Sequence, residues 1–318
     1  MLNRKTIAVV VPSHNEEKMI GKVIETMPVF VDIIILVDDD SSDRTIEIAK
    51  KVAKSSKRKL DLVILKQNRG VGGAIAAGYR RAVVLKMDAT AVMAGDAQMD
   101  PKELRDLCLP IVKNEADYVK GNRLAYGQAW QMIPKVRYLG NSVLSLLTKI
   151  ASGYWWVADS QTGYTVTALK TLKEVNLGNL YKRYGFPNDM LVHLNLIRAR
   201  VQEVPIKPIY YVGGKSGIRL WKVVPTISWL LFRRFFWRLK KEYVIENFHP
   251  LVFFYFFAIC LFITNIWLFI RLIYLWILNG KIPPMNALAL MFCLVMLGQF
   301  LFFAMWLDMD YNKDLRVR

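Results

Sequence analysis

The sequence has little cysteine and histidine, and it lacks several common catalytic motifs. Its three cysteines, Cys108, Cys260 and Cys293, form no C-x-x-C pair, so we expect free thiols in a reducing compartment. Its three histidines, His14, His193 and His249, have no metal-ligand spacing, so we expect them to be structural. A G-x-S-x-G elbow, a Walker loop and a G-x-G-x-x-G fingerprint are all absent. These absences argue against α/β-hydrolases, P-loop enzymes and dinucleotide-dependent enzymes.

Charged residues are missing from two long stretches near the C-terminus. Residues 250–270 and 286–307 contain none, and each stretch has the roughly 20 residues that cross about 30 Å of hydrocarbon. Their aromatic-rich ends favour membrane spans over buried core helices. We therefore predict two transmembrane helices, at about 250–274 and 286–307. Arg271 follows the first apolar stretch, and we expect it to reach the far membrane interface.

Positive charge is abundant and unevenly distributed. The formal net charge is +18, and residues 213–248 alone carry eight Lys or Arg against two Asp or Glu. Because this segment directly precedes an apolar stretch, we expect it to meet an anionic bilayer and not nucleic acid. The positive-inside rule then places both chain ends in the cytoplasm and makes the spans a hairpin. The N-terminal apolar stretch is too short for a signal peptide, so we expect the large domain to stay cytoplasmic.

Residues 218–248 mix aromatic and basic side chains. Trp229 and Phe232 alternate here with Arg233 and Arg234. This composition is typical of amphipathic helices that lie in the headgroup plane. Pro225 is expected to divide the segment into two helices.

The first 120 residues alternate apolar β-branched runs with helical patterns. Alternating units of this kind indicate a mostly parallel sheet covered on both faces. We predict strands at residues 6–11, 32–37, 60–65, 90–94 and 117–120, and helices at 16–27, 43–53, 72–86, from 101, and at 130–152. We therefore divide the chain into an α/β domain (1–217), interface helices (218–248) and two transmembrane helices with a short tail (249–318).

Four polar or glycine-rich turns follow the first four predicted strands. They read VVPSHNEE (10–17), LVDDDSSDRT (36–45), KQNRGVGGAIAAGY (66–79) and MAGDAQMDP (93–101). Each alone is compatible with a helix cap or a tight turn, but parallel sheets bind ligands at the carboxyl ends of their strands. In this order and spacing the turns resemble those of family 2 glycosyltransferases with the GT-A fold. The resemblance covers residues 5–217 and is nearest to dolichol-phosphate mannose synthases and polyprenyl-phosphate glucosyltransferases.

The resemblance implies a membrane-bound inverting enzyme with its catalytic domain on the cytoplasmic face. It would move a hexose, mannose or glucose, from a GDP- or UDP-sugar to a polyprenyl or dolichyl phosphate. Carboxylates suit ribose hydroxyls and base N–H groups, and a helix start suits a diphosphate. The residues that match the nucleotide-binding turns are Pro12, Asn15, Glu16, Asp38, Asp39, Asn68, Arg69, Gly70, Gly73 and Asp96.

The resemblance also implies a Mg²⁺ or Mn²⁺ ion bound by the D-x-D turn. Asp96 matches the second aspartate of this motif and Gln98 the glutamine after it, and both are candidates for holding the metal ion. A carboxylate here would hold the cation against the diphosphate. The first aspartate position is occupied by Ala94, so one expected ligand is missing or replaced.

Further matches imply residues for the acceptor phosphate and the sugar. Arginine pairs with phosphate oxygens through its planar fork. The acceptor candidates are Arg123, Arg137, Asn141 and Lys215. Asp159 and Gln98 are candidates for sugar contacts. Arg123, Asp96 and Asp189 are also expected to act in catalysis. Asp189 lies where related transferases carry a catalytic carboxylate, and we expect it to orient the sugar.

Three alternatives remain open at this stage. A processive polysaccharide synthase would share the nucleotide turns, but the Q-x-x-R-W motif of such enzymes is absent. A transferase that acts on another lipid or on a protein would need a general base such as Asp189. A non-catalytic membrane scaffold that keeps the fold is favoured only by Ala94.

Overall fold

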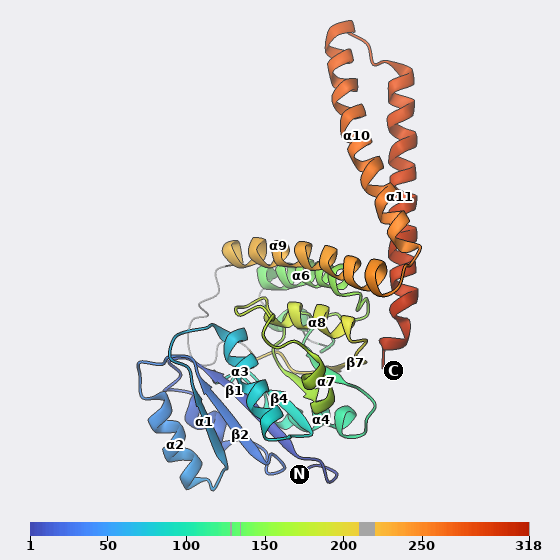
Figure 1. Cartoon of the computed structure of the whole chain (residues 1–318). Coiled ribbons are helices and arrows are strands. Elements are labelled where there is room, and N and C mark those ends of the chain that lie inside the picture. The colour runs from blue at the N-terminus through green and yellow to red at the C-terminus, as the bar shows by residue number, and fades with distance from the viewer. Residues whose placement is uncertain (128, 134, 210–219, 318) are drawn as a thin grey trace. The chain divides into compact units, whose positions relative to one another are not determined.

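The computed structural model describes residues 1–127, 129–133, 135–209 and 220–317 (Figure 1). The chain forms two compact units, one of Met1–Phe235 with Asp314–Arg318 and the other of Phe236–Lys313. Helix α9 (Leu220–Arg238) contributes residues to both units. The three-part division drawn from the sequence follows expected function and stays a prediction.

The described part of the first unit contains a seven-stranded sheet with the order β3-β2-β1-β4-β6-β5-β7 (Figure 1). The strands are β1 (Ile7–Ser13), β2 (Ile33–Asp38), β3 (Leu60–Ile64), β4 (Ala89–Val92), β5 (Tyr118–Asn122), β6 (Thr165–Ala168) and β7 (Val201–Pro205). β1 pairs in parallel with β2 and β4, β2 with β3, and β5 with β7, whereas β6 runs antiparallel to β4 and β5. The mostly parallel α/β fold predicted from the sequence is confirmed.

Both faces of the sheet are covered, which explains why its central strands are mostly apolar. Every residue of β1 and β2 is buried, as expected for parallel strands with helices on both sides. Helices on one face are α1 (Ile20–Glu25), α2 (Thr45–Ser55) and α4 (Leu104–Val112), the last preceded by the short η1 (Pro101–Glu103). Helices on the other face are α3 (Val71–Val84), α7 (Leu169–Glu174) and α8 (Phe186–Leu196).

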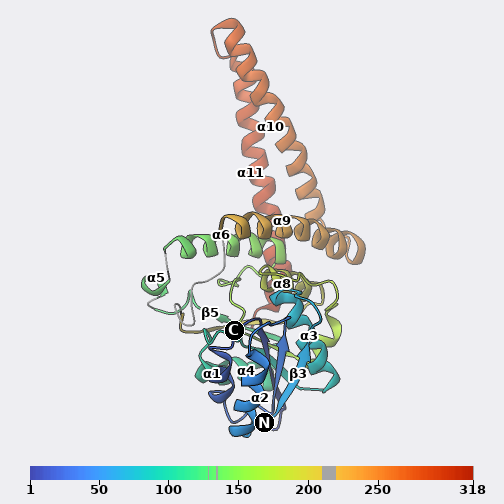
Figure 2. The same ribbon diagram turned by 90° about the vertical axis from the view of Figure 1, so that its left-hand side faces the viewer.

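Two further helices lie side by side at one end of this unit. They are α6 (Lys135–Ser152), preceded by the short α5 (Ala129–Met132), and the part of α9 up to Phe235 (Figures 1 and 2). Leu147 and Ile150 of α6 line an apolar groove together with Trp229 and Phe232 of α9. α6 and this part of α9 therefore lie along one apolar groove.

Two sequence-based expectations about helices are wrong. The first helix begins at Ile20 and not at Glu16, because the turn after β1 is irregular and Asn15 has a φ of +56°. Pro225 does not divide its segment, since α9 continues through it. Pro225 is exposed, so the carbonyl that loses its helical N–H partner can be solvated.

The second unit contains α10 (Leu251–Asn279) and α11 (Pro284–Asn312), followed by η3 (Lys313–Leu315), whose last residues return to the first unit. Among the described residues, these two helices are long and apolar enough to cross a membrane. They pack through rings such as Phe254 against Phe300 and Phe303. Arg271 lies over the ring of Trp267 at 5.3 Å. The predicted pair of apolar helices is present.

A buried ion pair joins the two ends of the second unit. Arg238 and Asp308 are fully buried, with Nη1 and Oδ1 2.9 Å apart. The hydroxyl of Tyr243, on the π-helical segment η2 (Leu239–Glu246), donates to the same carboxylate oxygen at 2.5 Å. The Asn312 amide also donates to Oδ1, at 3.2 Å. These bonds fix the start of η2 against the end of α11.

Candidate active site

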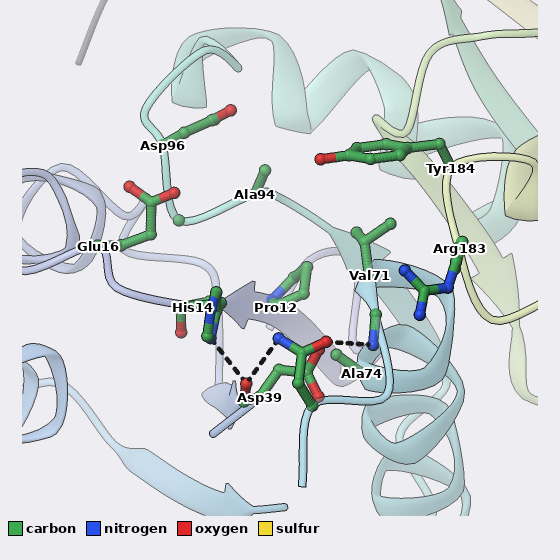
Figure 3. A pocket seen from close by; sticks show the side chains of 14 residues that line it. Pro12, His14, Glu16, Asp39, Val71, Ala74, Ala94, Asp96, Arg183 and Tyr184 are labelled. Carbon is green, nitrogen blue, oxygen red and sulfur yellow. Dashed lines mark hydrogen bonds between the residues drawn. The ribbon is translucent and has the colours of Figure 1, made fainter. Parts of the chain in front are cut away.

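A cavity of about 340 Å³ lies at the carboxyl ends of β1, β2 and β4, beside the start of α3. Figure 3 shows Glu16 and Asp96 on one side of it and Arg183 and Tyr184 on the other. Its lining includes these residues that match the nucleotide-binding turns: Pro12, Glu16, Asp39, Asn68, Gly70 and Asp96. Turns that are far apart in the sequence therefore meet in one place, as the topology of a parallel sheet predicts.

The turn after β1 is held by the loop that follows β2. Asn15 occupies the left-handed region, which asparagine tolerates better than most residues. Its Oδ1 accepts a hydrogen bond from the backbone N of Ser42 at 2.9 Å. The backbone N of Glu16 donates to Thr45 Oγ1 at 2.8 Å. Asn15 thus connects two loops, while Glu16 directs its carboxylate into the cavity (Figure 3).

The two acidic residues at the end of β2, Asp38 within the strand and Asp39 just after it, have different surroundings. Asp38 is only 1% exposed, and its Oδ2 accepts from the backbone N of Ser41 at 3.1 Å. Asp39 lines the cavity, and its Oδ1 accepts from the backbone N of Arg69 at 2.7 Å. The side chain of Arg69 is exposed. Of the expected acidic pair, Asp39 therefore lines the cavity, whereas Asp38 holds the loop that follows β2.

The glycines that begin α3 allow a close contact with a distant loop. Gly70 has a φ of +78°, and a Cβ there would lie 2.7 Å from the Lys182 carbonyl oxygen. A Cβ on Gly72 would lie 2.3 Å from the Tyr181 carbonyl oxygen. The backbone N of Gly73 donates to the Lys182 carbonyl at 3.0 Å. Gly73, predicted as a nucleotide-binding residue, here joins α3 to this loop.

Glu16 and Asp96 form an acidic side of the cavity. The Oδ1 of Asp96 accepts from the backbone N of Gln98 at 3.1 Å. Burial raises the pKa of the Asp96 carboxyl above its usual value. Burial and the neighbouring charge of Asp96 raise the pKa of Glu16 as well. Because the charge of Asp96 disfavours the ionised form of Glu16, a cation beside the two carboxylates would be favoured.

This donor set fits the divalent cation that the family resemblance implies. Mg²⁺ and related hard cations take carboxylate oxygens and keep several waters. Ala94 offers no ligand, but Glu16 supplies a second carboxylate from the turn after β1. In the part of the chain that the structure describes, no three His, Cys, Asp or Glu side chains gather into a metal cluster. The protein would therefore contribute two carboxylates, and the phosphates of a bound substrate would complete the coordination.

A smaller cavity of about 80 Å³ adjoins the first, since Asp96 lines both. Gln98 and Arg123 line it too. The Nε of Arg123 donates to Asp159 Oδ2 at 2.7 Å, and a terminal nitrogen donates to Oδ1 at 3.0 Å. Burial alone would raise the pKa of Asp159, but the charge and hydrogen bonds of Arg123 lower it below its usual value. A residue predicted for the acceptor and one predicted for the sugar thus form a single ion pair.

Other buried charges support this pair. Lys120 is fully buried, and its Nζ donates to the Thr162 carbonyl. The Oε1 of Glu203 accepts from the backbone N of Asp159 at 3.0 Å. Burial lowers the pKa of Lys120 from 10.5 to about 8, although Asp159 and Glu203 oppose this change. The end of β5 therefore carries a charged network and not an apolar core.

The structure places Asp189, a predicted catalytic residue, away from both cavities. This residue is fully buried, its Oδ1 accepts from Arg234 Nε at 2.6 Å, and its Oδ2 accepts from the backbone N of Tyr181 at 2.8 Å. It does not line either of the two cavities among the described residues. A buried carboxylate whose two oxygens are both occupied is suited to holding structure and not to touching a sugar.

The remaining acceptor candidates are only partly described. Asn141 is half-buried on α6 and lines neither cavity in the described structure. Arg137 also lies on α6, but its side chain is outside what the structure describes. Lys215 lies outside the described residues altogether.

Two residues of the larger cavity, Arg183 and Tyr184, could not be recognised from the sequence. Arg183 and Tyr184 come from the loop before α8, and no spacing links that loop to the nucleotide turns. Contacts with the start of α3 and with α9 bring it there. His14, expected to be structural, lines the cavity and also bonds through Nδ1 to the Asp39 carbonyl at 2.8 Å.

Comparison with known proteins agrees with this arrangement. The chain is 32% identical over 218 residues to the UDP-N-acetylglucosamine–dolichyl-phosphate N-acetylglucosaminyltransferase of Methanococcus voltae, covering 65% of this chain and 86% of that one. It is 28% identical to the undecaprenyl-phosphate mannosyltransferase of Micrococcus luteus, covering 72% and 95%. It is 25% identical to the dolichol-phosphate mannosyltransferase of Pyrococcus furiosus, covering 67% and 59%.

Solved structures confirm the fold. Glucosyl-3-phosphoglycerate synthase of Mycobacterium tuberculosis, solved with Mn²⁺ and UDP, superposes with a TM-score of 0.53 at 19% identity, covering 74% of this chain and 80% of that one. At this identity the similarity extends to the GT-A-like fold alone. Residues 8–175 match the family described as Glycosyl transferase family 2. With this match and the relatives above, the chain belongs to glycosyl transferase family 2.

Proposed function

We propose that this chain transfers a hexose from a nucleoside-diphosphate sugar to a polyprenyl or dolichyl phosphate, with inversion at the anomeric carbon. The observation that carries the proposal is the meeting of Asp39, Glu16 and Asp96 in one cavity that adjoins Arg123. The three relatives compared above, whose names specify a polyprenyl or dolichyl phosphate, support the acceptor class.

The larger cavity is proposed to hold the nucleoside diphosphate. Asp39 and Asn68 offer polar groups for the ribose and base. Glu16 and Asp96 would hold Mg²⁺ or Mn²⁺, which as a Lewis acid stabilises the negative charge of a diphosphate leaving group. The sugar would then lie toward the smaller cavity, where Gln98 and Arg123 are placed.

The acceptor needs orientation more than activation. A phosphate monoester has a second pKa of about 6, so its oxygen is already a nucleophile at neutral pH. That oxygen would form a bond to the anomeric carbon while the bond from this carbon to the diphosphate oxygen breaks, and the diphosphate would leave with the electron pair. Arg123 would hold the acceptor phosphate while Asp159 fixes the guanidinium, because a guanidinium has five N–H donors. This scheme requires no general base, in agreement with the buried position of Asp189.

The membrane part of the proposal keeps the organisation drawn from the sequence. Residues 1–217 form the catalytic domain on the cytoplasmic face, 218–248 lie at the interface, and 249–318 anchor the chain through α10 and α11. Exposed aromatic side chains on α9, including Trp229 at 63% and Phe232 at 53%, support its contact with lipid.

One assay tests the proposal directly. The purified full chain in lipid nanodiscs is given labelled GDP-mannose, UDP-glucose or UDP-N-acetylglucosamine with polyprenyl phosphate, and labelled lipid is extracted. Product from a hexose donor supports the proposal. Product from UDP-N-acetylglucosamine alone would keep the proposed acceptor but show that the transferred sugar is N-acetylglucosamine and not a hexose. Transfer to another lipid or to a growing polysaccharide, without product on polyprenyl phosphate, favours the other family 2 activities. Absence of donor turnover with every acceptor favours a scaffold.

A further inference from the structure

We propose that Arg234 and Asp189 act as positioning residues that hold the loop of residues 179–185, so that its Arg183 and Tyr184 bind the nucleoside diphosphate. The inference rests on the proposed function of the larger cavity and adds Arg183 and Tyr184 to its nucleotide-binding residues as a further wall of the cavity. It also gives helix α9, on the lipid-facing side of the proposed enzyme, an indirect influence on donor binding.

The loop is fixed from the α9 side by one ion pair. Arg234 Nε lies 2.6 Å from Asp189 Oδ1, and a terminal nitrogen of Arg234 donates to the Asn179 carbonyl at 2.9 Å. Asp189 Oδ2 accepts from the backbone N of Tyr181 at 2.8 Å. Asp189 is fully buried, and the side chain of Arg234 is 21% exposed. Hydrogen bonds between charged groups in a partly desolvated place are strong and directional, so they set the path of the loop.

The loop is fixed from the other side by α3 and again by α9. The backbone N of Gly73 donates to the Lys182 carbonyl at 3.0 Å. Gly72 leaves no room for a Cβ against Tyr181. At the end of the loop, a Cβ on Gly185 would lie 2.9 Å from a methyl carbon of Leu230 on α9. The loop therefore lies between two helices, with little freedom at residues 181, 182 and 185.

Arg183 and Tyr184 lie between these fixed points and line the cavity. Figure 3 shows them across the cavity from Glu16 and Asp96. A guanidinium suits phosphate oxygens, and the ring of Tyr184, which is 52% exposed, offers an aromatic surface for a base or ribose. A cation on one side and a guanidinium on the other would hold a diphosphate between two positive groups.

The test is a double-mutant cycle on nucleotide binding, measured by calorimetry with UDP and GDP in the presence of Mn²⁺ and without acceptor lipid. The full chain in nanodiscs is compared with Arg183→Ala, Arg234→Ala and the double variant. We expect each single variant to weaken binding by about tenfold, as for loss of a charge-assisted hydrogen bond. If Arg234 acts through the loop, the double variant should bind no more weakly than the weaker single variant.

Controls distinguish positioning from general damage. Arg233→Ala removes the neighbouring exposed arginine of the same helix and should bind within about twofold of the wild type, since exposed charges contribute little. Arg234→Lys should retain part of the affinity, because it keeps the charge and loses the fork. Tyr184→Ala removes the aromatic surface and should bind the nucleotide more weakly than the wild type.

Other outcomes overturn the inference. If the losses of nucleotide affinity multiply in the double variant, Arg234 does not act through Arg183. If Arg183→Ala binds nucleotide like the wild type, Arg183 is not part of the binding site. If Arg234→Ala does not fold, Arg234→Lys combined with Arg183→Ala gives the same cycle. A wild-type chain that binds neither nucleotide overturns the donor site and this inference together. A chain that binds nucleotide but does not use polyprenyl phosphate loses only the acceptor assignment.

Discussion

Glu16 and Asp96, from the turns after β1 and β4, place their carboxylates on the same side of one cavity (Figure 3). The two groups are close enough that the charge of Asp96 raises the pKa of Glu16. Ala94 occupies the position where family members carry another aspartate, so the second carboxylate of this site comes from a different strand. Under the proposed function, Glu16 and Asp96 would be the two protein ligands of a divalent cation.

Removing either carboxylate should weaken cation binding. We expect Asp96→Asn to abolish transfer and Glu16→Gln to reduce it, because each substitution keeps the shape and removes a charged ligand. In both variants Mn²⁺ binding in the presence of UDP, measured by electron paramagnetic resonance, should fall by about tenfold or more. Far-ultraviolet circular dichroism should show an unchanged fold.

A restoring substitution makes this test specific. Ala94→Asp returns a carboxylate to the first position of the motif, so it should recover part of the Mn²⁺ affinity lost in Glu16→Gln. Near-wild-type transfer by Asp96→Asn would remove the cation from the mechanism. Full Mn²⁺ affinity in Glu16→Gln would limit the protein ligands to Asp96.

The turns that carry Glu16 and Asp96 could be predicted from the sequence because each is a short segment that directly follows an apolar strand. Strands such as β1 and β2 are continuous apolar runs, and each polar turn follows such a run directly. Their meeting is a consequence of parallel pairing, which fixes the carboxyl ends at one edge. The fold and six residues of the larger cavity could therefore be predicted without coordinates.

The wall formed by Arg183 and Tyr184 could not be predicted in this way. Its position depends on contacts between Asp189, Arg234 and the glycines of α3, which are distant in the sequence and have no periodic pattern. For the same reason Asp189 was assigned by motif alone, and its burial became evident only from the packing of α9. Long-range ion pairs of this kind are properties of tertiary structure.

Replacing Arg123 should impair acceptor use more than donor binding. In Arg123→Ala, loss of the guanidinium proposed to bind the acceptor phosphate predicts a rise in the KM for polyprenyl phosphate of about tenfold or more. The Kd for UDP or GDP should change little. Arg123→Lys keeps the charge but loses the paired hydrogen bonds to Asp159. Its KM for polyprenyl phosphate should therefore lie between those of the wild type and Arg123→Ala.

The same substitution also tests the ion pair. Arg123→Ala leaves the fully buried Asp159 without its main cation, which should lower the free energy of unfolding by about 3 kcal/mol. Arg123→Ala combined with Asp159→Asn should recover part of this loss. Unchanged kinetics with the lipid acceptor in Arg123→Ala would discard the acceptor role.

Gly72→Ala should disturb the contact between α3 and the 179–185 loop. Its Cβ would lie 2.3 Å from the Tyr181 carbonyl oxygen and 2.8 Å from Phe186 Cβ, so the backbone must move, at a cost of about 1–3 kcal/mol. Gly140→Ala on α6 is the control, because a Cβ there meets nothing within 4 Å and should stabilise the helix by up to about 1 kcal/mol. Thermal unfolding of the two variants would show opposite shifts.

The buried pair in the second unit should matter far more than an exposed pair nearby. Asp308→Ala leaves Arg238 buried without its carboxylate, so we expect a loss of about 3–5 kcal/mol in unfolding free energy. Asp310→Ala removes a pair with Lys313 whose side chains are 55% and 62% exposed, and this should change stability by less than about 1 kcal/mol. Equal melting temperatures of the two variants in detergent would contradict this difference.

Lys120 should make stability depend on pH in the alkaline range. Its pKa falls from 10.5 to about 8 in the folded chain because of burial. The unfolded chain therefore binds more protons between these values, so the contribution of Lys120 to stability is full above 10.5 and is lost as pH falls through about 8. Over this range the contribution amounts to about 3 kcal/mol.

Lys120→Met tests this assignment, because methionine fills similar space without a charge. Relative to the wild type, its unfolding free energy should be higher at pH 7, where burying an ammonium group is unfavourable, and the difference should shrink as pH rises from 8 to 10.5. Lys51→Met, at an exposed position of α2, should shift stability equally at every pH. Denaturant titrations at pH 7, 8, 9 and 10 on all three proteins measure both differences. A constant gap between wild type and Lys120→Met across this series would mean that Lys120 keeps an ordinary pKa, held charged by Asp159 and Glu203.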